Sequence, residues 1–254
     1  MDHLEFYKKI FSKQKIYESK ANLLQREVII RWLNNKLTNY CIINTLDISN
    51  KRDIFFSCVS ILDNYINKSN DKVNHLVGIT CLFISLKMET VDATFKIDFF
   101  VHCIIGYMQT FSYNDVTMEI IKTEKKILNV LKFELHHITG VNNFLHLLFE
   151  LNDEKNNELK EITWYIAELS LYSLPKITPS LLAISAYILS KLKIRIEYDT
   201  VNITNAIESH KLIEMSLHNY NDVRKSVVFL NKMVTMDNEV YKDYIEIPIK
   251  KYFK

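Results

Sequence analysis

The sequence predicts an all-helical protein made of two similar helical bundles, and three observations support this fold class. Apolar residues make up 48% of the 254 positions, enough for a large core in one or two domains. The chain has only three glycines and three prolines, whereas the turns of a sheet-rich enzyme, or a phosphate-binding loop, would require more glycine. Apolar residues also recur at helical spacing along most of the chain. We therefore expect helices joined by short polar connections.

Composition and charge disfavour several other classes of protein. The formal net charge of +2 is too small to indicate a nucleic-acid binder. Cys41, Cys58, Cys81 and Cys103 lie far apart without a C-x-x-C pair, so we interpret them as reduced residues rather than disulfides or zinc ligands. The N-terminus lacks the apolar run of a secretion signal, and the longest apolar stretch, 76–86, is too short to span a bilayer. A soluble intracellular protein is expected.

The first half of the chain contains six segments with helical spacing of apolar residues. In the segment 53–66 the apolar positions follow an i, i+1, i+4 rhythm, which predicts a helix with one buried face. The segment 76–87 is apolar nearly all round, so we expect it to form the central helix of a bundle. The other predicted helices cover 3–20, a segment that starts near Leu23, 95–108 and 114–131.

The second half repeats this organisation. Residues 76–85 align without gaps on 181–190, with small residues and hydroxyls at matching positions. An internal duplication explains this match, and chance similarity between two buried helices is the alternative. A duplication predicts two bundles, each built around one all-apolar helix. The predicted helices of the second half cover 141–151, 156–173, 179–192, 203–216 and 219–235.

Several segments, in the right order and at the right spacing, resemble motifs of the cyclin family, and in the second half those of its A/B-type, cell-cycle branch. The helix 25–33 is similar to the opening M-R-A-I-L-x-x-W-L of the first cyclin box, and 61–66 is similar to L-D-R-F-L. Residues 76–89 resemble L-V-G…A-S-K-x-E-E, and 124–133 resemble E-x-x-I-L-x-x-L-x-F. Further matching segments in the second half are 143–145, 167–171 and 179–183.

This resemblance implies a fold, a function and a partner. The fold is two tandem five-helix cyclin boxes, at 23–136 and 137–236, with an N-terminal helix at 1–22 and a C-terminal extension at 237–254. The function is that of a non-catalytic regulatory subunit, which binds and activates a cyclin-dependent serine/threonine kinase in the nucleus, the cytoplasm or both. No cofactor and no membrane are expected. Kinase substrates or inhibitors are possible further partners, through a groove on the first helix of the box.

The resemblance also implies that Lys87 and Glu124 contact the kinase. Position alone favours two solvated helix residues, but the resemblance reverses this interpretation, because the family uses this pair to hydrogen-bond the kinase backbone around its C-helix. We expect Glu89, from the same motif as Lys87, to belong to this surface. An apolar rim is expected around the charged pair, because buried apolar anchors give large interfaces their affinity. The expected rim residues are Ile84, Met88, Leu128, Phe133 and Leu135, with Tyr7 from the N-terminal helix.

Two further groups of residues follow from the first box. Arg26 and Asp63 lie among apolar neighbours on helices expected to pack together, so a buried ion pair with a structural role is predicted. The family's substrate-docking groove maps onto the first helix and the start of the third, but its acidic position is Asn35 here, so altered recognition of Arg-x-Leu peptides is expected. A partly buried core role for Trp32 is the alternative. The groove positions are Gln25, Val28, Ile29, Trp32, Asn35 and His75.

Other functions find less support in the sequence. No nucleophile–base arrangement is recognised, and His102–Cys103 and His136–His137 are adjacent pairs that seldom face one metal, so we expect neither a catalytic residue nor a metal site. A transcription-type cyclin, or a tandem cyclin-repeat transcription factor or scaffold, is the alternative. DNA binding would favour a basic second repeat. That repeat instead carries acidic residues at Glu150, Asp153, Glu154, Glu158, Glu161 and Glu168.

Overall fold

The computed structural model describes residues 23–69, 71–90, 97–135, 140–173, 177–194 and 218–240. Within these ranges the chain forms helices joined by loops and contains no strand, which confirms the all-α prediction. The described residues divide into two compact units, one that ends at Gly140 and one that starts at Val141. The predicted helices at 3–20 and 203–216 lie outside the described residues, and the four domain bounds remain a prediction.

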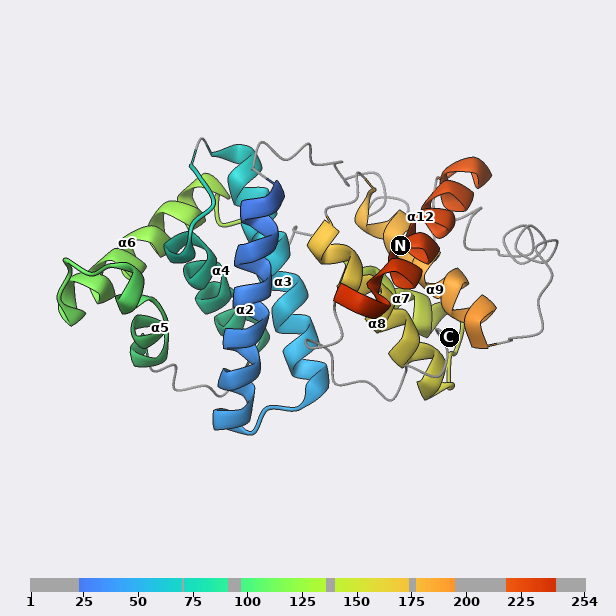
Figure 1. The fold of residues 1–254 in the computed structure, drawn as a ribbon, viewed down its shortest axis with the longest axis horizontal. Helices are drawn as coiled ribbons and strands as arrows, with labels where there is room; N and C mark the ends of the chain where they lie inside the picture. Colours follow the sequence, from blue (N-terminus) through green and yellow to red (C-terminus); the bar gives the residue numbers. More distant parts are fainter. Residues whose placement is uncertain are drawn as a thin grey trace, which may run out of the picture. The chain divides into compact units, whose positions relative to one another are not determined.

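The first unit is organised around one central helix. Helix α4 (His75–Glu89) packs against each of the other α-helices of its unit, and every residue from 77 to 86 is buried. Figure 1 shows α4 between α6 and the pair formed by α2 and α3. The all-round apolar pattern of this segment therefore does predict a central helix. The surrounding helices are α2 (Leu23–Asn44), α3 (Ile48–Lys68), α5 (Ile97–Ile104), which continues into the short 3-10 helix η1 (Ile105–Tyr107), and α6 (Tyr113–Val130).

A glycine sets the distance between the central helix and α2. A Cβ atom at Gly78 would lie 2.8 Å from Ile29 Cγ2 and 3.3 Å from Leu33 Cδ1. The first distance is shorter than a carbon–carbon contact allows, and Ile29 and Leu33 are themselves fully buried. The small residue at this position of α4 therefore permits the close approach of the two helices.

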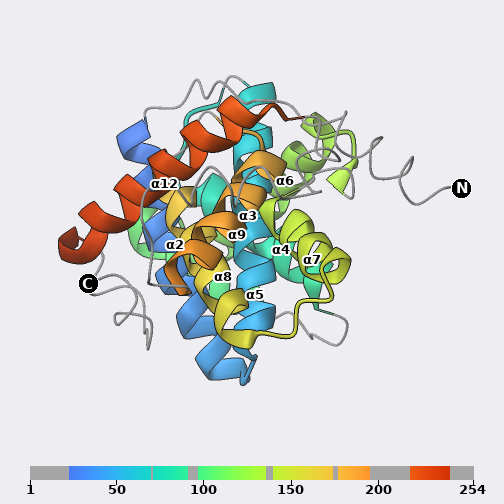
Figure 2. The same cartoon turned by 90° about the vertical axis from the view of Figure 1, so that its right-hand side faces the viewer.

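The second unit has the same organisation. Helix α9 (Pro179–Ile194) packs against the other three described helices of the unit. Figure 2 shows α12 crossing over α9. The two aligned segments of the sequence, 76–85 and 181–190, thus lie in the central helices of the two units. The helices around α9 are α7 (Val141–Leu151), α8 (Asn157–Ser173) and α12 (Tyr220–Val240).

Short polar side chains define where several helices begin. Asp47 accepts a hydrogen bond from the backbone N–H of Asn50 at the start of α3, and Asn74 accepts one from Val77 at the start of α4. Ser112 and Asp115 form a reciprocal capping box at the start of α6. Each cap satisfies a backbone N–H that has no partner within the helix. None of the helices in the described ranges is long and apolar enough to cross a membrane.

A buried ion pair joins α2 to α3. The guanidinium of Arg26 donates from Nε to Asp63 Oδ1 and from Nη2 to Asp63 Oδ2, both at 2.7 Å. Only 2% of the Arg26 side chain is exposed. A bidentate pair of this kind compensates for the loss of water around both charges.

Three of the four cysteines belong to the core of the first unit. Cys41, Cys58 and Cys81 are buried, whereas Cys103 is half-buried, and all four are free thiols. Burial raises the pKa of the Cys41 thiol to about 11, and it also raises the pKa of Cys58 and Cys81. These thiols therefore remain protonated and behave as small apolar residues.

Candidate functional site

The structure brings Lys87 and Glu124 together at the surface of the first unit. Lys87 lies in the last turn of α4, and its Nζ donates to Oε1 of Glu124 on α6 at 2.7 Å. The ammonium group also lies 3.9 Å from the ring centroid of Phe83, within the range of a cation–π interaction. The Lys87 side chain is 39% exposed and that of Glu124 is 17% exposed. Both charged groups are held in place and remain accessible.

The apolar residues expected around this pair are exposed to different degrees. Phe133 is 63% exposed, and Met88, Leu128 and Leu135 are half-buried. Ile84 differs from its expected place in the rim, because it points into the packed interior of the unit and is 2% exposed. Tyr7 lies outside the described residues. The accessible residues of the expected rim are therefore Phe133 and the three half-buried residues.

The backbone after α6 fixes the position of Phe133. Leu131 ends the helix, and the next two residues, Lys132 and Phe133, have φ angles of 55° and 56°. The N–H of Phe133 donates to the carbonyl of Leu128 at 2.8 Å, and the N–H of Lys132 donates to that of Asn129 at 3.0 Å. These two bonds form a Schellman motif. It directs the chain away from the helix axis and leaves the Phe133 ring in solvent.

Glu89 is held by the neighbouring helix. Ser57 Oγ on α3 donates to Glu89 Oε1 at 2.5 Å, and Glu89 is the last residue of α4, in the turn that carries Lys87. Lys87 and Glu89 thus lie in the last turn of α4, and Glu124 lies in the second half of α6. The arrangement contains hydrogen-bond donors and acceptors for a partner's backbone, but no paired nucleophile and base.

The groove positions on α2 surround an aromatic cluster. The Trp32 ring meets His75 edge-on at a centroid distance of 4.8 Å and Tyr107 at 5.8 Å, and His75 stacks on Tyr107 at 3.9 Å. Burial lowers the pKa of His75, so the imidazole is neutral at pH 7. Trp32 is half-buried, which leaves part of the indole accessible. Trp32 therefore packs partly in the core, and the accessible part of its ring lies at the predicted groove.

The other groove positions are divided between surface and core. Val28 is 51% exposed, whereas Ile29 is 1% exposed and faces Gly78. Gln25 Nε2 donates to the carbonyl of Val73 at 2.6 Å, so its amide is occupied within the unit. Asn35 is exposed and brings no charge. None of the six groove positions therefore carries an acidic side chain that would pair with a basic peptide.

Comparison with known proteins identifies the fold and its relatives. The protein-family model described as "Cyclin, N-terminal domain" matches residues 3–136, more than half of the chain. The chain belongs to the cyclin family. This confirms the resemblance stated from the sequence motifs.

Plant cyclins are among the relatives of this cyclin. Cyclin-A1-2 of Oryza sativa subsp. japonica is 28% identical over 178 residues, which cover 67% of this chain and 34% of the relative. Cyclin-A3-3 of Arabidopsis thaliana is 30% identical over 175 residues, and cyclin-B2-2 of Oryza sativa subsp. indica is 27% identical over 173 residues. The chain spans about a third of the length of the rice A1-type cyclins that it matches.

A solved structure shares the fold of this cyclin over most of its length. The viral cyclin from herpesvirus saimiri superposes with a TM-score of 0.63 and covers 91% of this chain and 95% of its own. The sequence identity is 18%, so the likeness concerns the fold.

Sequence reasoning missed three residues that shape these surfaces in this cyclin. Phe83 lies in the apolar segment 76–87, whose pattern predicts only a core role, although its ring lies beneath the Lys87 ammonium group. Ser57 gave no signal, because its bond to Glu89 joins residues far apart in the chain. Tyr107, just after the end of α5, is not among the predicted groove residues, although its ring stacks on His75. An aromatic residue after the end of a helix was the available signal.

Proposed function

We propose that this cyclin binds a cyclin-dependent protein kinase and activates it as a regulatory subunit that contributes no catalytic residue. The observation that carries the proposal is the ion pair between Lys87 and Glu124. Phe133, in the turn that follows the helix of Glu124, adds an exposed aromatic ring. These are the positions through which the family resemblance implies contact with the kinase. Lys87 and Glu124 come from separate helices and meet at the surface of the first unit, which supports the proposal.

The chemistry of this surface suits a protein partner. A lysine ammonium donates hydrogen bonds to backbone carbonyls, and a glutamate carboxylate accepts them from backbone N–H groups. Hydrogen bonds to charged groups contribute about 1.5–3 kcal/mol each. The half-buried Met88 follows Lys87 in the chain, and it and the exposed ring of Phe133 supply accessible apolar area in the same unit. Together they supply apolar anchors with a charged pair that fixes orientation.

The ion pair between Lys87 and Glu124 does not prevent such binding. Because the lysine side chain is 39% exposed, the pair is close to the surface class whose net contribution is about 0–1 kcal/mol. Exchanging one partner for a kinase backbone group therefore costs little. The pair keeps both side chains oriented until a partner arrives.

Activation follows from differential affinity. A protein kinase is active only when the glutamate of its C-helix pairs with the catalytic lysine. A partner that binds the inward position of that helix more tightly than the outward position shifts the kinase toward the active state. A rigid surface on α4 and α6 is sufficient for this role.

The relatives support a cell-cycle role over the transcription-type alternative, because the plant proteins that match this chain are named as A- and B-type cyclins. We extend the proposal to a location in the nucleus, the cytoplasm or both, where such kinases act.

The test measures binding and activation with variants of the charged pair. Purified chain is captured against a panel of cyclin-dependent kinases, and phosphorylation of a histone-type substrate is followed for each complex. Removing both side chains, in Lys87→Ala/Glu124→Ala, should weaken binding about 10- to 100-fold, the equivalent of one strong charged hydrogen bond. The control is Lys122→Ala, which removes an exposed ion pair with Glu119 on the same helix.

A charge exchange separates binding from stability. The variant Lys87→Glu/Glu124→Lys keeps an internal ion pair but reverses the donor and acceptor offered to the kinase. If the proposal is right, this variant folds like the wild type and still fails to bind. Failure of the wild-type chain to bind any kinase of the panel would refute the proposal, and so would full activation by the exchanged variant.

A further inference from the structure

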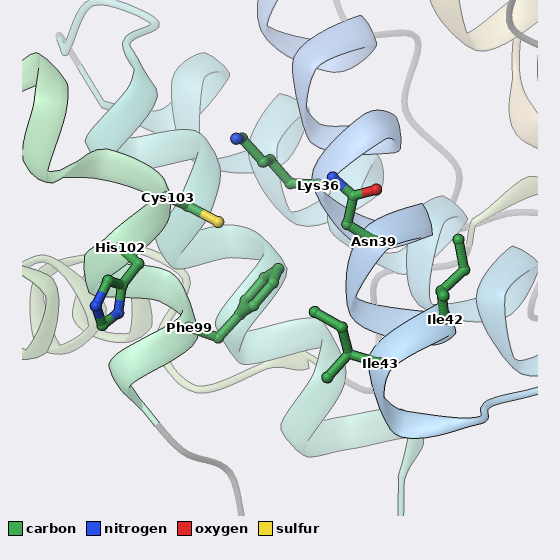
Figure 3. Close-up of a pocket in the computed structure, with 7 residues that line it drawn as sticks. All are labelled: Lys36, Asn39, Ile42, Ile43, Phe99, His102 and Cys103. Carbon is green, nitrogen blue, oxygen red and sulfur yellow. The ribbon is translucent and has the colours of Figure 1, made fainter.

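A second surface of the first unit is hollowed between α2 and α5. A pocket of about 370 Å³ lies between the C-terminal half of α2 and the short helix α5. Figure 3 shows Lys36 and Ile43 extending from α2, and Phe99 and Cys103 from α5, toward the space between the helices. His102 points away from α2. The volume falls at the lower end of the range for binding pockets.

The pocket has an exposed aliphatic side and a fixed aromatic wall. Ile42 and Ile43 are 71% and 69% exposed, which is unusual for two adjacent large aliphatic residues. Phe99 is supported from behind, because its ring packs edge-on against Tyr40 at 5.0 Å and against Phe100 at 5.4 Å. An aliphatic side chain that enters between Ile43 and Phe99 would be enclosed on two sides. The apolar character of the site alone does not say what enters it.

The charge of the pocket narrows the choice of occupant. None of the seven lining residues is acidic, and Lys36 contributes a positive charge to the pocket. Within the described ranges no carboxylate forms an ion pair with Lys36, whereas Arg31, one turn earlier, is paired with Glu27 at 2.7 Å. Asp98, beside Phe99, accepts a hydrogen bond from the hydroxyl of Tyr113. An ammonium group at an apolar pocket without a carboxylate favours an anionic ligand group.

Lys36 faces the pocket from α2. Its positive charge lowers the pKa of Cys103 on the opposite wall and so opposes the larger effect of burial, which raises it. Its Nζ also lies 5.8 Å from the Trp32 ring centroid, so the same side chain joins the pocket to the aromatic cluster. Trp32, Lys36, Asn39 and Ile43 follow the i, i+4, i+7, i+11 spacing of one helical face.

We propose that this pocket docks a short acidic segment of the kinase's protein substrates, with an aliphatic side chain between Ile43 and Phe99 and an Asp or Glu carboxylate on Lys36. Lys36 and Ile43 are seven residues apart, about 10 Å along the helix. An extended peptide covers that length with about three residues. The segment therefore carries its carboxylate about three positions from its aliphatic anchor. The identity of the partner as a substrate rests on the proposed function, whereas the chemistry of the pocket does not.

The test uses the full chain alone and synthetic peptides. Each fluorescein-labelled eight-residue peptide contains one leucine in a serine–glycine background, with one glutamate placed from one to five residues away on either side. Binding is measured by anisotropy and by chemical-shift changes in the labelled chain. We expect saturable binding that is strongest at a spacing of about three residues, and at least tenfold weaker when glutamine or phosphoserine replaces glutamate at that spacing.

Variants of the chain locate the site. Lys36→Glu should weaken binding of the glutamate peptide at least tenfold and should bind the matching lysine peptide better than the wild type does. Ile43→Ser should weaken the binding of both peptides. Lys155→Glu carries the same change of charge at an exposed position of the second unit and should bind like the wild type. Equal binding of glutamate and glutamine peptides, or no change in preference with Lys36→Glu, would overturn the proposal.

Two other occupants are distinguished in the same experiment. Tighter binding of the phosphoserine peptide would replace the carboxylate with a phosphate group and overturn the assignment. A dimer in sedimentation that is lost in Ile42→Ser/Ile43→Ser would show that a second copy of the chain covers the pocket. Peptide binding is measured without a kinase, so a failure to bind peptide does not depend on the result of the kinase-binding test with the Lys87 and Glu124 variants.

Discussion

The ion pair between Arg26 and Asp63 shows how one buried charge limits the tolerance of the first unit. Arg26 is 2% exposed and binds Asp63 through two parallel hydrogen bonds, whereas the nearby pair of Arg31 and Glu27 lies nearer the surface. Both ion pairs involve an arginine on α2, but the free energy lost when the carboxylate is removed differs between them. A buried guanidinium without its carboxylate has lost the charge that compensated for its dehydration.

We predict that Asp63→Ala lowers the free energy of unfolding by about 3–5 kcal/mol. The matched control, Glu27→Ala, should cost less than about 0.5 kcal/mol, as expected for a single i, i+4 pair. Urea unfolding followed by circular dichroism measures both. A loss of less than about 1 kcal/mol for Asp63→Ala would show that Arg26 is compensated by other groups.

At the scale of the elements, the contact between α2 and α4 depends on Gly78. Ile29 and Leu33 fill the space that a side chain at this position would need. A glycine within a helix costs about 1 kcal/mol relative to alanine, so its presence in the central helix has to be offset by the packing that it permits.

We predict that Gly78→Val destabilises the first unit by about 1–3 kcal/mol through overpacking against Ile29. Gly106→Ala serves as the control, because a Cβ at Gly106 meets nothing within 4 Å. Thermal unfolding of the two variants gives the comparison. An unchanged melting temperature for Gly78→Val would contradict the prediction, because it would mean that α2 and α4 can move apart without any loss of stability.

The rhythm of apolar residues predicted the helices well, because burial on one face imposes that rhythm. The ends of the helices were less predictable. Helix α3 begins at Ile48 rather than near 53, since Asp47 caps it and the polar first turn hides the pattern. Thr45 and Lys132 have positive φ angles, where glycine is the usual signal. A chain with three glycines ends helices with other residues, which the sequence does not mark.

The candidate site was predictable in part for a similar reason. Lys87 and Glu124 were found through family motifs, and their helices were clear from the apolar pattern. The α2–α5 pocket was not predicted, because Ile43 and Phe99 come from segments whose contact depends on the packing of the whole unit. No local pattern identifies a pair of residues that meets only after folding.

At the scale of the whole molecule, each unit holds a half-buried histidine. His75 belongs to the first unit, and His218, just before α12, belongs to the second, where its Nε2 lies 2.7 Å from Ser180 Oγ. Burial lowers the pKa of both imidazoles, and Asp222 partly opposes this for His218. A histidine whose pKa is lower in the folded state than in the unfolded state binds fewer protons when folded.

We therefore predict that the stability contributed by the two neutral imidazoles is fully present above about pH 6.5, the ordinary pKa of histidine. The free energy of unfolding should decline as the pH falls below that value. His218→Gln, which keeps a polar group near Ser180, should reduce the decline between pH 7 and pH 5. Urea titrations at several pH values measure it. The pKa of Asp71 is lowered mainly by its hydrogen bond from Lys126, so its contribution is lost only below about pH 4. Identical pH profiles for variant and wild type would contradict the prediction.

The Schellman motif that ends α6 has a consequence for the speed of assembly. Two backbone hydrogen bonds fix the loop that carries Phe133 before any other protein is present. The entropy of ordering that loop is lost when the chain folds, so it is not lost again at each encounter. A protein that recognises this ring can then associate by rigid-body collision, without waiting for a loop to find its bound shape.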